Sequence, residues 1–438
     1  MGPNRTGSES HAEFRAANPA CIGSPAPDPS SAEAAGGPSA PRPDLFDKCR
    51  GFTRAKEAQA AGLYPYFIPI SGSEGTEVRI EGERKIMLGS NNYLGLTHDP
   101  RVLDAAEGAA RTYGSGCTGS RFLNGTLDLH EKLERELAEY VGKEAALVFS
   151  TGFQTNLGII ATLAGRDDAV ILDKLDHACI IDGAILSQAN VYRFNHNDVA
   201  HLENVMQRVE RELPRAGKLV VVDGIFSMEG DIADLPRIIP VVRKYGARIL
   251  VDEAHSVGVM GPGGSGVHEH FGLSDDCDLL MGTFSKSFAS IGGFAASTEN
   301  TIHYLKHHAR SLIFSASMPP YAVATVREAL RIARAEPERR DRLWANQRRL
   351  KDGLEALGFN LGTTTTPVVP VIVGETQKTF VFWKTLFEMG VFTNPVIPPA
   401  VPEHTSRIRT SLMATHTGEL IDEALEIFQR AGKKVGLI

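Results

Sequence analysis

The sequence predicts an α/β protein: a large domain with a mostly parallel sheet, followed by a smaller α+β C-terminal domain. Short apolar or β-branched runs alternate with helical stretches through the middle of the chain, which is typical of a parallel sheet covered on both faces. After the Met318-Pro319-Pro320 break come a charged helical stretch and Pro-rich loops. With 438 residues and 42% hydrophobic composition, the chain is long enough for more than one domain.

The first 44 residues are rich in Ala, Gly, Ser and Pro, with few large apolar side chains. Such a segment cannot bury enough surface to offset the entropy of ordering it, so we expect a disordered tail at 1–44. After it we expect an N-terminal segment at 45–100, a large domain at 101–325 and a small C-terminal domain at 326–438.

The secondary structure of the middle follows from periodicity. Leu129, Leu133, Leu137 and Val141 recur at every fourth position among charged residues and predict an amphipathic helix. Further helices are expected over 156–163 and, with many charges, over 326–357. Short apolar runs predict buried strands at 145–149, 169–172, 219–222, 248–251 and 279–281.

Bulk composition excludes several classes of function. The net charge of −7 and the lack of a long basic run argue against a nucleic-acid surface. No apolar stretch reaches the length of a membrane span. The five cysteines are scattered and lack CxxC spacing, which favours reduced thiols in a cytosolic protein over disulfides or a zinc site.

Lys286 is the most informative residue. It follows an apolar run and lies within Thr283-Phe284-Ser285-Lys286, beside two hydroxyl groups. An amine in such a place suits a Schiff base with a cofactor aldehyde, and the hydroxyls of Thr283 and Ser285 suit a phosphate. An ordinary surface lysine is the alternative.

Asp252 ends another apolar run, and His255 follows three residues later. A carboxylate at the carboxyl end of a strand can keep a pyridine nitrogen protonated, and the histidine can reach the ring's phenolic oxygen. A helix cap and a structural histidine are the alternatives. Together with Lys286, these residues predict a pyridoxal phosphate site.

Other polar residues also follow predicted strands. Gly152 and Phe153 begin a helix after a strand, where free backbone N–H groups form an anion site. His177 follows the next strand and could stack on a flat ring or act as acid or base. Arg409 could grip an amino-acid carboxylate, with a surface arginine as the alternative. The literal GxGxxG at 261–266 lacks the strand and the ribose-binding acid of a dinucleotide site, so it predicts a turn.

From about Phe52 onward the chain resembles the α-oxoamine synthases, a fold-type-I pyridoxal phosphate family. The resemblance rests on separate motifs in the family's order. They are Asn91-Asn92-Tyr93-Leu94-Gly95, the 114–121 and 226–231 segments, the Asp252–His255 and Lys286 segments, and Ile397-Pro398-Pro399-Ala400-Val401-Pro402.

Within the family, Thr283-Phe284-Ser285-Lys286-Ser287 is similar to the bacterial, homodimeric branch that uses L-serine. The segments 119–126 and 313–317 share this likeness. The resemblance implies a mostly parallel seven-stranded sheet and a homodimer with the site at the subunit interface. It also implies decarboxylative condensation of L-serine with a long-chain acyl-CoA to 3-ketodihydrosphingosine, CO2 and free thiol. A cytoplasmic location with peripheral contact to the inner membrane would suit the lipid product.

Carried over by position, the family's roles fall on particular residues. Lys286 would bind the cofactor aldehyde, His177 would stack on the ring, and Asp252 and His255 would contact its nitrogen and phenolic oxygen. The phosphate would be bound by Thr283, Ser285, Gly152, Phe153 and the partner subunit's Ser315, and the substrate carboxylate by Asn92 and Arg409. Phe153 and Val401 depart from the pattern, because a tyrosine and a threonine are also found there.

Three rival functions remain open at the level of sequence. A glycine- or alanine-using synthase shares all of this chemistry. An aminotransferase shares the fold, but the motifs outside the cofactor site disfavour it. A non-catalytic regulatory subunit of this family would lack the lysine, so Lys286 argues against it.

Overall fold

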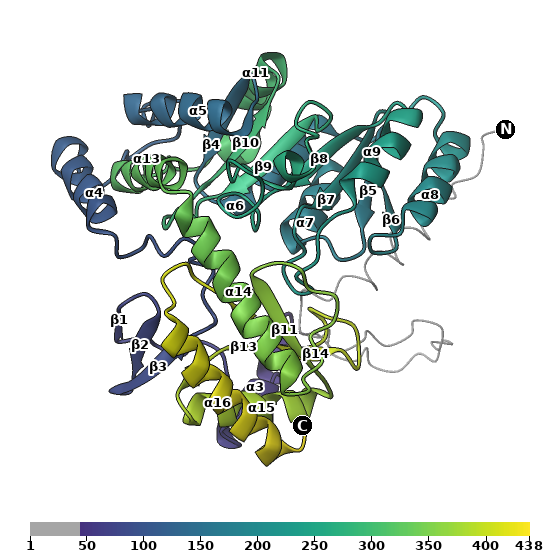
Figure 1. Ribbon diagram of the computed structural model, residues 1–438. Helices are drawn as coiled ribbons and strands as arrows, with labels where there is room; N and C mark the ends of the chain where they lie inside the picture. Colours follow the sequence, from purple (N-terminus) through teal and green to yellow (C-terminus); the bar gives the residue numbers. More distant parts are fainter. Residues whose placement is uncertain (1–43) are drawn as a thin grey trace.

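The computed structural model describes residues 44–438, so all of the predicted tail except Asp44 lies outside the described residues. The large domain is built on a seven-stranded sheet (Figure 1). In spatial order its strands are β4 (Ala145–Phe149), β10 (Gly293–Ser297), β9 (Leu279–Thr283), β8 (Arg248–Asp252), β7 (Lys218–Asp223), β5 (Ala169–Asp173) and β6 (Asn190–Phe194). All neighbours are parallel except that β10 runs antiparallel to β4 and β9. The predicted mostly parallel seven-stranded sheet is confirmed.

Both faces of this sheet are buried, because alternate residues of its strands enter two separate apolar cores. One core packs against α6 (Gly152–Leu163), α7 (Ala178–Ser187), α11 (Glu299–His308) and α12 (Arg310–Ile313). The other packs against α5 (Asp128–Val141), α8 (Val199–Glu212), α9 (Leu235–Lys244) and α13 (Pro320–Ala335). The helices α4 (Pro100–Tyr113) and α10 (Val267–His270) complete this part of the chain.

The predicted helices are found. The amphipathic helix is α5, and its four predicted apolar residues are buried. The predicted charged helical stretch at 326–357 is found as two helices, α13 and α14 (Glu338–Ala356), separated at Glu336-Pro337. Proline lacks the N–H that would continue the helix and disfavours helical geometry in the residue before it.

The small domain contains two further sheets (Figure 1). A three-stranded antiparallel sheet contains β11 (Val368–Gly374), β14 (Ser406–Ser411) and β13 (Asn394–Val396), in that order. A second sheet joins β1 (Gly72–Ser73), β2 (Glu77–Ile80) and β3 (Glu83–Met87) of the N-terminal segment to β12 (Val391–Phe392). The remaining helices are α2 (Asp47–Arg50), α3 (Arg54–Ala60), α15 (Thr376–Glu388) and α16 (Gly418–Val435).

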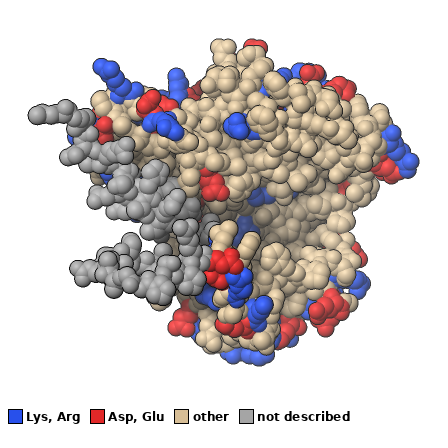
Figure 2. Space-filling model, turned by 180° about the vertical axis from the view of Figure 1, so that it is seen from behind, with Lys and Arg blue, Asp and Glu red and all other residues tan. Residues whose placement is uncertain are grey.

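The predicted domain boundaries stay a prediction. α13 packs on α4 and α5 of the large domain, whereas α14 packs on α16 of the small one. This packing supports a junction at Pro337. On one face, the molecule is hollowed between its two domains (Figure 2). Within residues 44–438, no helix is long and apolar enough to cross a membrane.

Candidate active site

A cavity of about 340 Å³ lies at the carboxyl edge of the parallel strands, the usual ligand edge of such a sheet. Ser315 is the one predicted cofactor residue that is missing from its lining. The other eight line it: Lys286, Asp252, His255, His177, Thr283, Ser285, Gly152 and Phe153. A larger cavity of about 660 Å³ lies at the opposite edge, around the amino ends of the strands, and contains none of these residues. The convergence of the predicted residues, rather than cavity size, identifies the candidate site.

Asp252 ends β8 and is buried. Its Oδ1 accepts a hydrogen bond from the Ala254 N–H at 2.8 Å, and its Oδ2 accepts one from Asn156 Nδ2 at 2.7 Å. No ion pair joins it to a cation among the described residues. A buried carboxylate without a cation is costly, so Asp252 fits a protonated pyridine nitrogen as its missing partner.

Lys286 lies just beyond the end of β9, half-buried in the cavity. Burial lowers the pKa of its ammonium, Asp252 opposes this shift and Arg409 adds to it. Within residues 44–438, no hydrogen bond or ion pair holds its Nζ. A lowered pKa and a free amine are what a carbonyl-binding lysine needs, because the neutral form is the nucleophile.

The first turn of α6 fits the phosphate. Thr151 caps the helix by accepting from the Gln154 N–H at 3.1 Å, and the N–H groups of Gly152 and Phe153 precede the first helical hydrogen bonds. A Cβ on Gly152 would lie 2.7 Å from Thr283 Oγ1, so the close approach requires glycine. The hydroxyls of Thr283 and Ser285 lie 3.0 Å apart beside this helix end. Together with Lys286 and Asp252, the residues present fit pyridoxal phosphate at its phosphate, aldehyde and ring nitrogen.

Two histidines lie beside the ring site. His177 caps α7, and its ring meets the Phe153 ring edge-on at 6.5 Å between centroids. His255 is buried and pairs through Nδ1 with the Tyr93 hydroxyl at 2.7 Å. Burial lowers the pKa of His255 well below its ordinary value, and the positive charges of Lys286 and Arg409 add to this. His255 is therefore neutral and free to share a hydrogen with a phenolic oxygen.

Arg409, on β14 of the small domain, is only 4% exposed. Its guanidinium donates to the Ser227 carbonyl at 2.7 Å, to Ser411 Oγ at 2.9 Å and to Asn91 Oδ1 at 3.0 Å. No carboxylate pairs with it in the described part of the chain. A guanidinium has five N–H donors, so two remain for an anion. A buried cation with spare donors beside Lys286 is suited to a substrate carboxylate.

Asn92 is the other predicted substrate contact, and like Arg409 it does not line the cavity. Its Nδ2 donates to Thr97 Oγ1 at 2.8 Å and its Oδ1 accepts from the Leu96 N–H at 3.0 Å, so its amide fastens its own loop. The preceding residue, Asn91, is the one bound to Arg409. The sequence motif contains both asparagines, and nothing in it indicates which of the two contacts Arg409.

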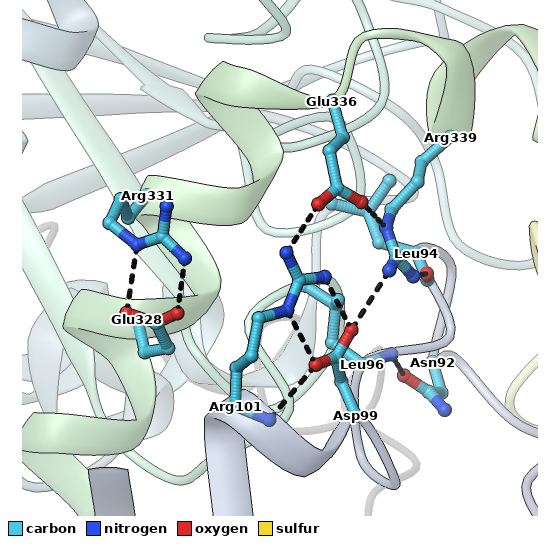
Figure 3. A network of polar contacts seen from close by, with 9 residues as sticks. All are labelled: Asn92, Leu94, Leu96, Asp99, Arg101, Glu328, Arg331, Glu336 and Arg339. Atoms are coloured by element: carbon cyan, nitrogen blue, oxygen red, sulfur yellow. Dashed lines mark hydrogen bonds and ion pairs between the residues drawn. The ribbon is translucent and has the colours of Figure 1, made fainter.

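A network of four charges anchors this loop to both domains (Figure 3). Arg339 at the start of α14 bonds to Asp99 and Glu336, each at 2.8 Å, and to the Leu94 carbonyl at 3.2 Å. Arg101 of α4 completes the ring with bonds to the same two acids at 2.8 and 2.5 Å. The network therefore fixes the loop that carries Asn91 and Tyr93.

Ser315 does not line the cavity of its own chain. Its Oγ accepts a hydrogen bond from Gln154 Nε2 at 2.9 Å, beside the first turn of α6. Phe153 and Val401 are the two residues that differ from the family pattern. Phe153 lines the cavity and has no hydroxyl group to offer, and Val401 is buried.

Several site residues were missed by sequence reasoning: Tyr93, Asn156, Cys179, Asp223 and Ser227. Asp223 is the register partner of Asp252 on the neighbouring strand and is buried in the cavity wall. Burial raises the pKa of Asp223 well above its ordinary value, and Asp252 adds to the shift while Lys286 opposes it. The one available signal was its position, since it ends an apolar strand as Asp252 does.

Comparison with known proteins gives matches along most of the chain. The family model "Aminotransferase class I and II" matches residues 83–428. A serine palmitoyltransferase of Sphingobacterium spiritivorum is 51% identical over 390 residues, covering 89% of this chain and 97% of that one. An 8-amino-7-oxononanoate synthase of Treponema denticola is 41% identical over 88% of this chain and 97% of that one. A serine palmitoyltransferase structure from S. paucimobilis, with bound PLP and myriocin, has a TM-score of 0.88 at 41% identity and covers 90% and 100% of the two chains.

Proposed function

Because the chain belongs to the aminotransferase class I and II family, and within it to the pyridoxal phosphate-dependent α-oxoamine synthases, we propose that it catalyses the serine palmitoyltransferase reaction. L-Serine and palmitoyl-CoA are joined to give 3-ketodihydrosphingosine, CO2 and CoA, the first step of sphingolipid synthesis. The observation that carries the choice of amino acid is the likeness to serine palmitoyltransferases, at 51% identity against 41% for the 8-amino-7-oxononanoate synthase.

The residues of the cavity divide the work of this reaction. Bound pyridoxal phosphate supplies an electron-withdrawing ring that stabilises negative charge at the serine Cα. Asp252 would keep the hydrogen on the ring nitrogen, the first turn of α6 with Thr283 and Ser285 would bind the phosphate, and His255 would contact the phenolic oxygen. We assign His177 to the ring face. These roles rest on the contacts described above.

Lys286 and Arg409 act on the amino acid. Lys286 Nζ would remove the proton from the serine Cα, which its lowered pKa permits, and return a proton after CO2 has left. Arg409 would bind the serine carboxylate with its two spare donors and so orient the Cα–H bond toward Lys286. Asn91, rather than Asn92, would hold the guanidinium in place.

We also propose that the active unit is a homodimer with the site near the subunit interface. Large apolar side chains around Ser315 are exposed in the single chain: Leu123 at 77%, Phe314 at 74%, Phe122 at 52% and Phe153 at 42%. Ser120 forms a bridge with Ala316, which brings two of these segments together. A second copy would cover this patch and bring Ser315 to the partner's phosphate site. We place the enzyme in the cytoplasm, with peripheral contact to the inner membrane where its lipid product leaves.

The test is a titration of the cofactor-loaded protein with L-serine, glycine, L-alanine and L-threonine, followed by cofactor absorbance. We expect saturation with serine at far lower concentration than with the others. Preference for glycine or alanine would keep the family and replace the substrate. Amino transfer to a keto acid would indicate an aminotransferase, and no cofactor band in folded protein would indicate a non-catalytic subunit.

A further inference from the structure

The exposed face of α11 contains two histidines one helical turn apart. Ile302 and Leu305 of this helix are buried on its inner side, where α11 packs on α6 and β4 (Figure 1). His303 and His307 are exposed. Side chains four positions apart are neighbours on a helix, and the centroids of these two imidazole rings lie 4.4 Å apart. The pair has the i, i+4 spacing with which two histidines on one helix face bind zinc.

The contacts of His307 leave one of its ring nitrogens free for a cation. Its Nδ1 lies 2.8 Å from the backbone carbonyl oxygen of His303. A carbonyl oxygen can only accept, so Nδ1 carries the hydrogen and the lone pair of the neutral ring is on Nε2. Metal-binding histidines typically donate their other ring N–H to a carbonyl or carboxylate in this way. The Phe122 ring meets the His307 ring edge-on at 6.4 Å between centroids, which further restricts its orientation.

Imidazole ligands select among metal ions. They suit Cu²⁺, Ni²⁺ and Zn²⁺, whereas Mg²⁺ and Ca²⁺ prefer oxygen ligands. Affinity at such a site follows the Irving–Williams order, so Cu²⁺ should bind more tightly than Ni²⁺ or Zn²⁺. Among residues 44–438, no group of three or more His, Cys, Asp or Glu side chains could hold a metal ion. Water would therefore complete the coordination of an ion bound to the histidine pair.

We propose that His303 and His307 form a binding site for a divalent transition-metal ion, with Nε2 of His307 and a ring nitrogen of His303 as its two protein ligands. Neither residue lines the candidate active-site cavity. The inference therefore goes beyond the proposed function and does not depend on it. An ion bound to both rings would link two successive turns of α11 and stabilise the folded protein, because it binds the helix and not the unfolded chain.

The test is a calorimetric titration of tag-free, cofactor-loaded protein with Ni²⁺. His303→Ala and His307→Ala each remove one ligand, so each should weaken the binding by at least about tenfold. His308→Ala is the matched control. His308 lies on the same helix, with Nδ1 2.9 Å from the Tyr304 carbonyl oxygen. One turn before it stands Tyr304 rather than a histidine, and the two rings stack at 4.1 Å between centroids, so this variant should keep the parent affinity.

Electron paramagnetic resonance with one equivalent of Cu²⁺ counts the ligands. The parent protein and His308→Ala should show two imidazole nitrogens, and His303→Ala and His307→Ala should show one. Mg²⁺ in excess should not displace Ni²⁺.

Three results would overturn the proposal. They are a parent protein without saturable Ni²⁺ binding, equal affinity in the parent and both ligand variants, and an equal loss in His308→Ala. All three substitutions change exposed side chains, and circular dichroism checks that the fold is kept. The titration contains neither amino acid nor thioester, so its failure would leave the proposed function untouched.

Discussion

The two halves of the site are built in different ways. The cofactor half comes from one sheet and the helix that follows its strand β4: Asp252 ends β8, Thr283 ends β9 and Gly152 begins α6. The substrate half joins strand β14 of the small domain to the 91–97 loop and the turn after β7. The first half depends on local chain geometry, and the second on contacts across domains. Substitutions in the first should therefore stop chemistry, and those in the second should change binding.

Replacing Lys286 with alanine should have the largest effect. Among the described residues Lys286 is the one lysine that lines the cavity, so its loss removes the base for the Cα proton and we expect turnover to fall by at least about 10⁴-fold. Product formation from serine and palmitoyl-CoA measures the loss, and circular dichroism shows whether the fold is kept. Substantial residual turnover in folded protein would remove Lys286 from its assigned role.

Asp252→Asn should follow, with a loss of about 10²–10³-fold. Asparagine keeps the shape but cannot hold the hydrogen on the ring nitrogen as a carboxylate does. The direct measurement is exchange of the serine Cα hydrogen in D2O, followed by NMR without the thioester. A normal exchange rate would contradict the pairing of Asp252 with the ring nitrogen.

Sequence reasoning located the cofactor half well for a physical reason. An apolar run followed by a polar residue marks the end of a buried strand, and parallel strands end at one edge. β6 and β10 gave no such signal, because Asn190–Phe194 is mixed in character and Gly293–Ser297 consists mostly of small residues.

The substrate half was harder to predict. Nothing local distinguishes Asn91 from Asn92, since the choice depends on which amide meets Arg409 of the other domain. The pairing of Asn156 with Cys179 likewise arises from two helices packed side by side, and no sequence spacing reports it. The junction at Glu336-Pro337 is a different case, because Pro337 is visible in the sequence and a proline disfavours helical geometry in the residue before it.

Arg409→Lys tests the substrate half most directly. Lysine cannot reproduce the planar, two-pronged grip on a carboxylate, so we expect KM for serine to rise by about 30–100-fold, with a smaller fall in kcat. The matched control is Arg407→Lys, two residues earlier on β14, where the guanidinium pairs with Glu229 instead. The control should lower stability and change KM little. Equal rises in KM for both variants would place the effect in domain contact rather than carboxylate binding.

A weaker effect is expected from the charge network of Figure 3. Arg339→Ala removes the bonds from α14 to Asp99 and to the Leu94 carbonyl, so the 91–97 loop loses part of its anchor. We expect kcat/KM to fall by about 3–10-fold, mostly through KM. Arg331→Ala is the control, because that arginine pairs only with Glu328 on its own helix among the contacts drawn. Identical kinetics in the two variants would show that the network does not position the loop.

His196 should affect activity least and show a dependence on pH. Its two ring nitrogens contact Asp173 at 3.1 Å and Asp231 at 2.9 Å, beside the turn whose Ser227 carbonyl accepts from Arg409. Burial lowers the pKa of His196, but the hydrogen bonds to both acids outweigh it and raise the pKa to about 10. In the unfolded chain this pKa is about 6.5. The folded state thus binds the proton more tightly, so the stabilisation is complete below about pH 6.5 and is lost as pH rises through about 10.

Denaturant unfolding of His196→Gln and the parent protein at pH 6, 8 and 10 measures this dependence. The variant should be less stable by up to about 4 kcal/mol at pH 6, and the difference should shrink steadily toward pH 10. His201→Gln is the matched control, because the His201 ring accepts from the Asn195 N–H and contacts no carboxylate among the described residues, while the bond from its backbone N–H to Asp198 is kept in the variant. A difference that stays constant with pH would show that His196 acts through packing. Packing, rather than the charge on His196, would then stabilise the turn that contacts Arg409. The cofactor half is also positioned by local packing, at its strand ends, so the two halves would differ less than their contacts indicate.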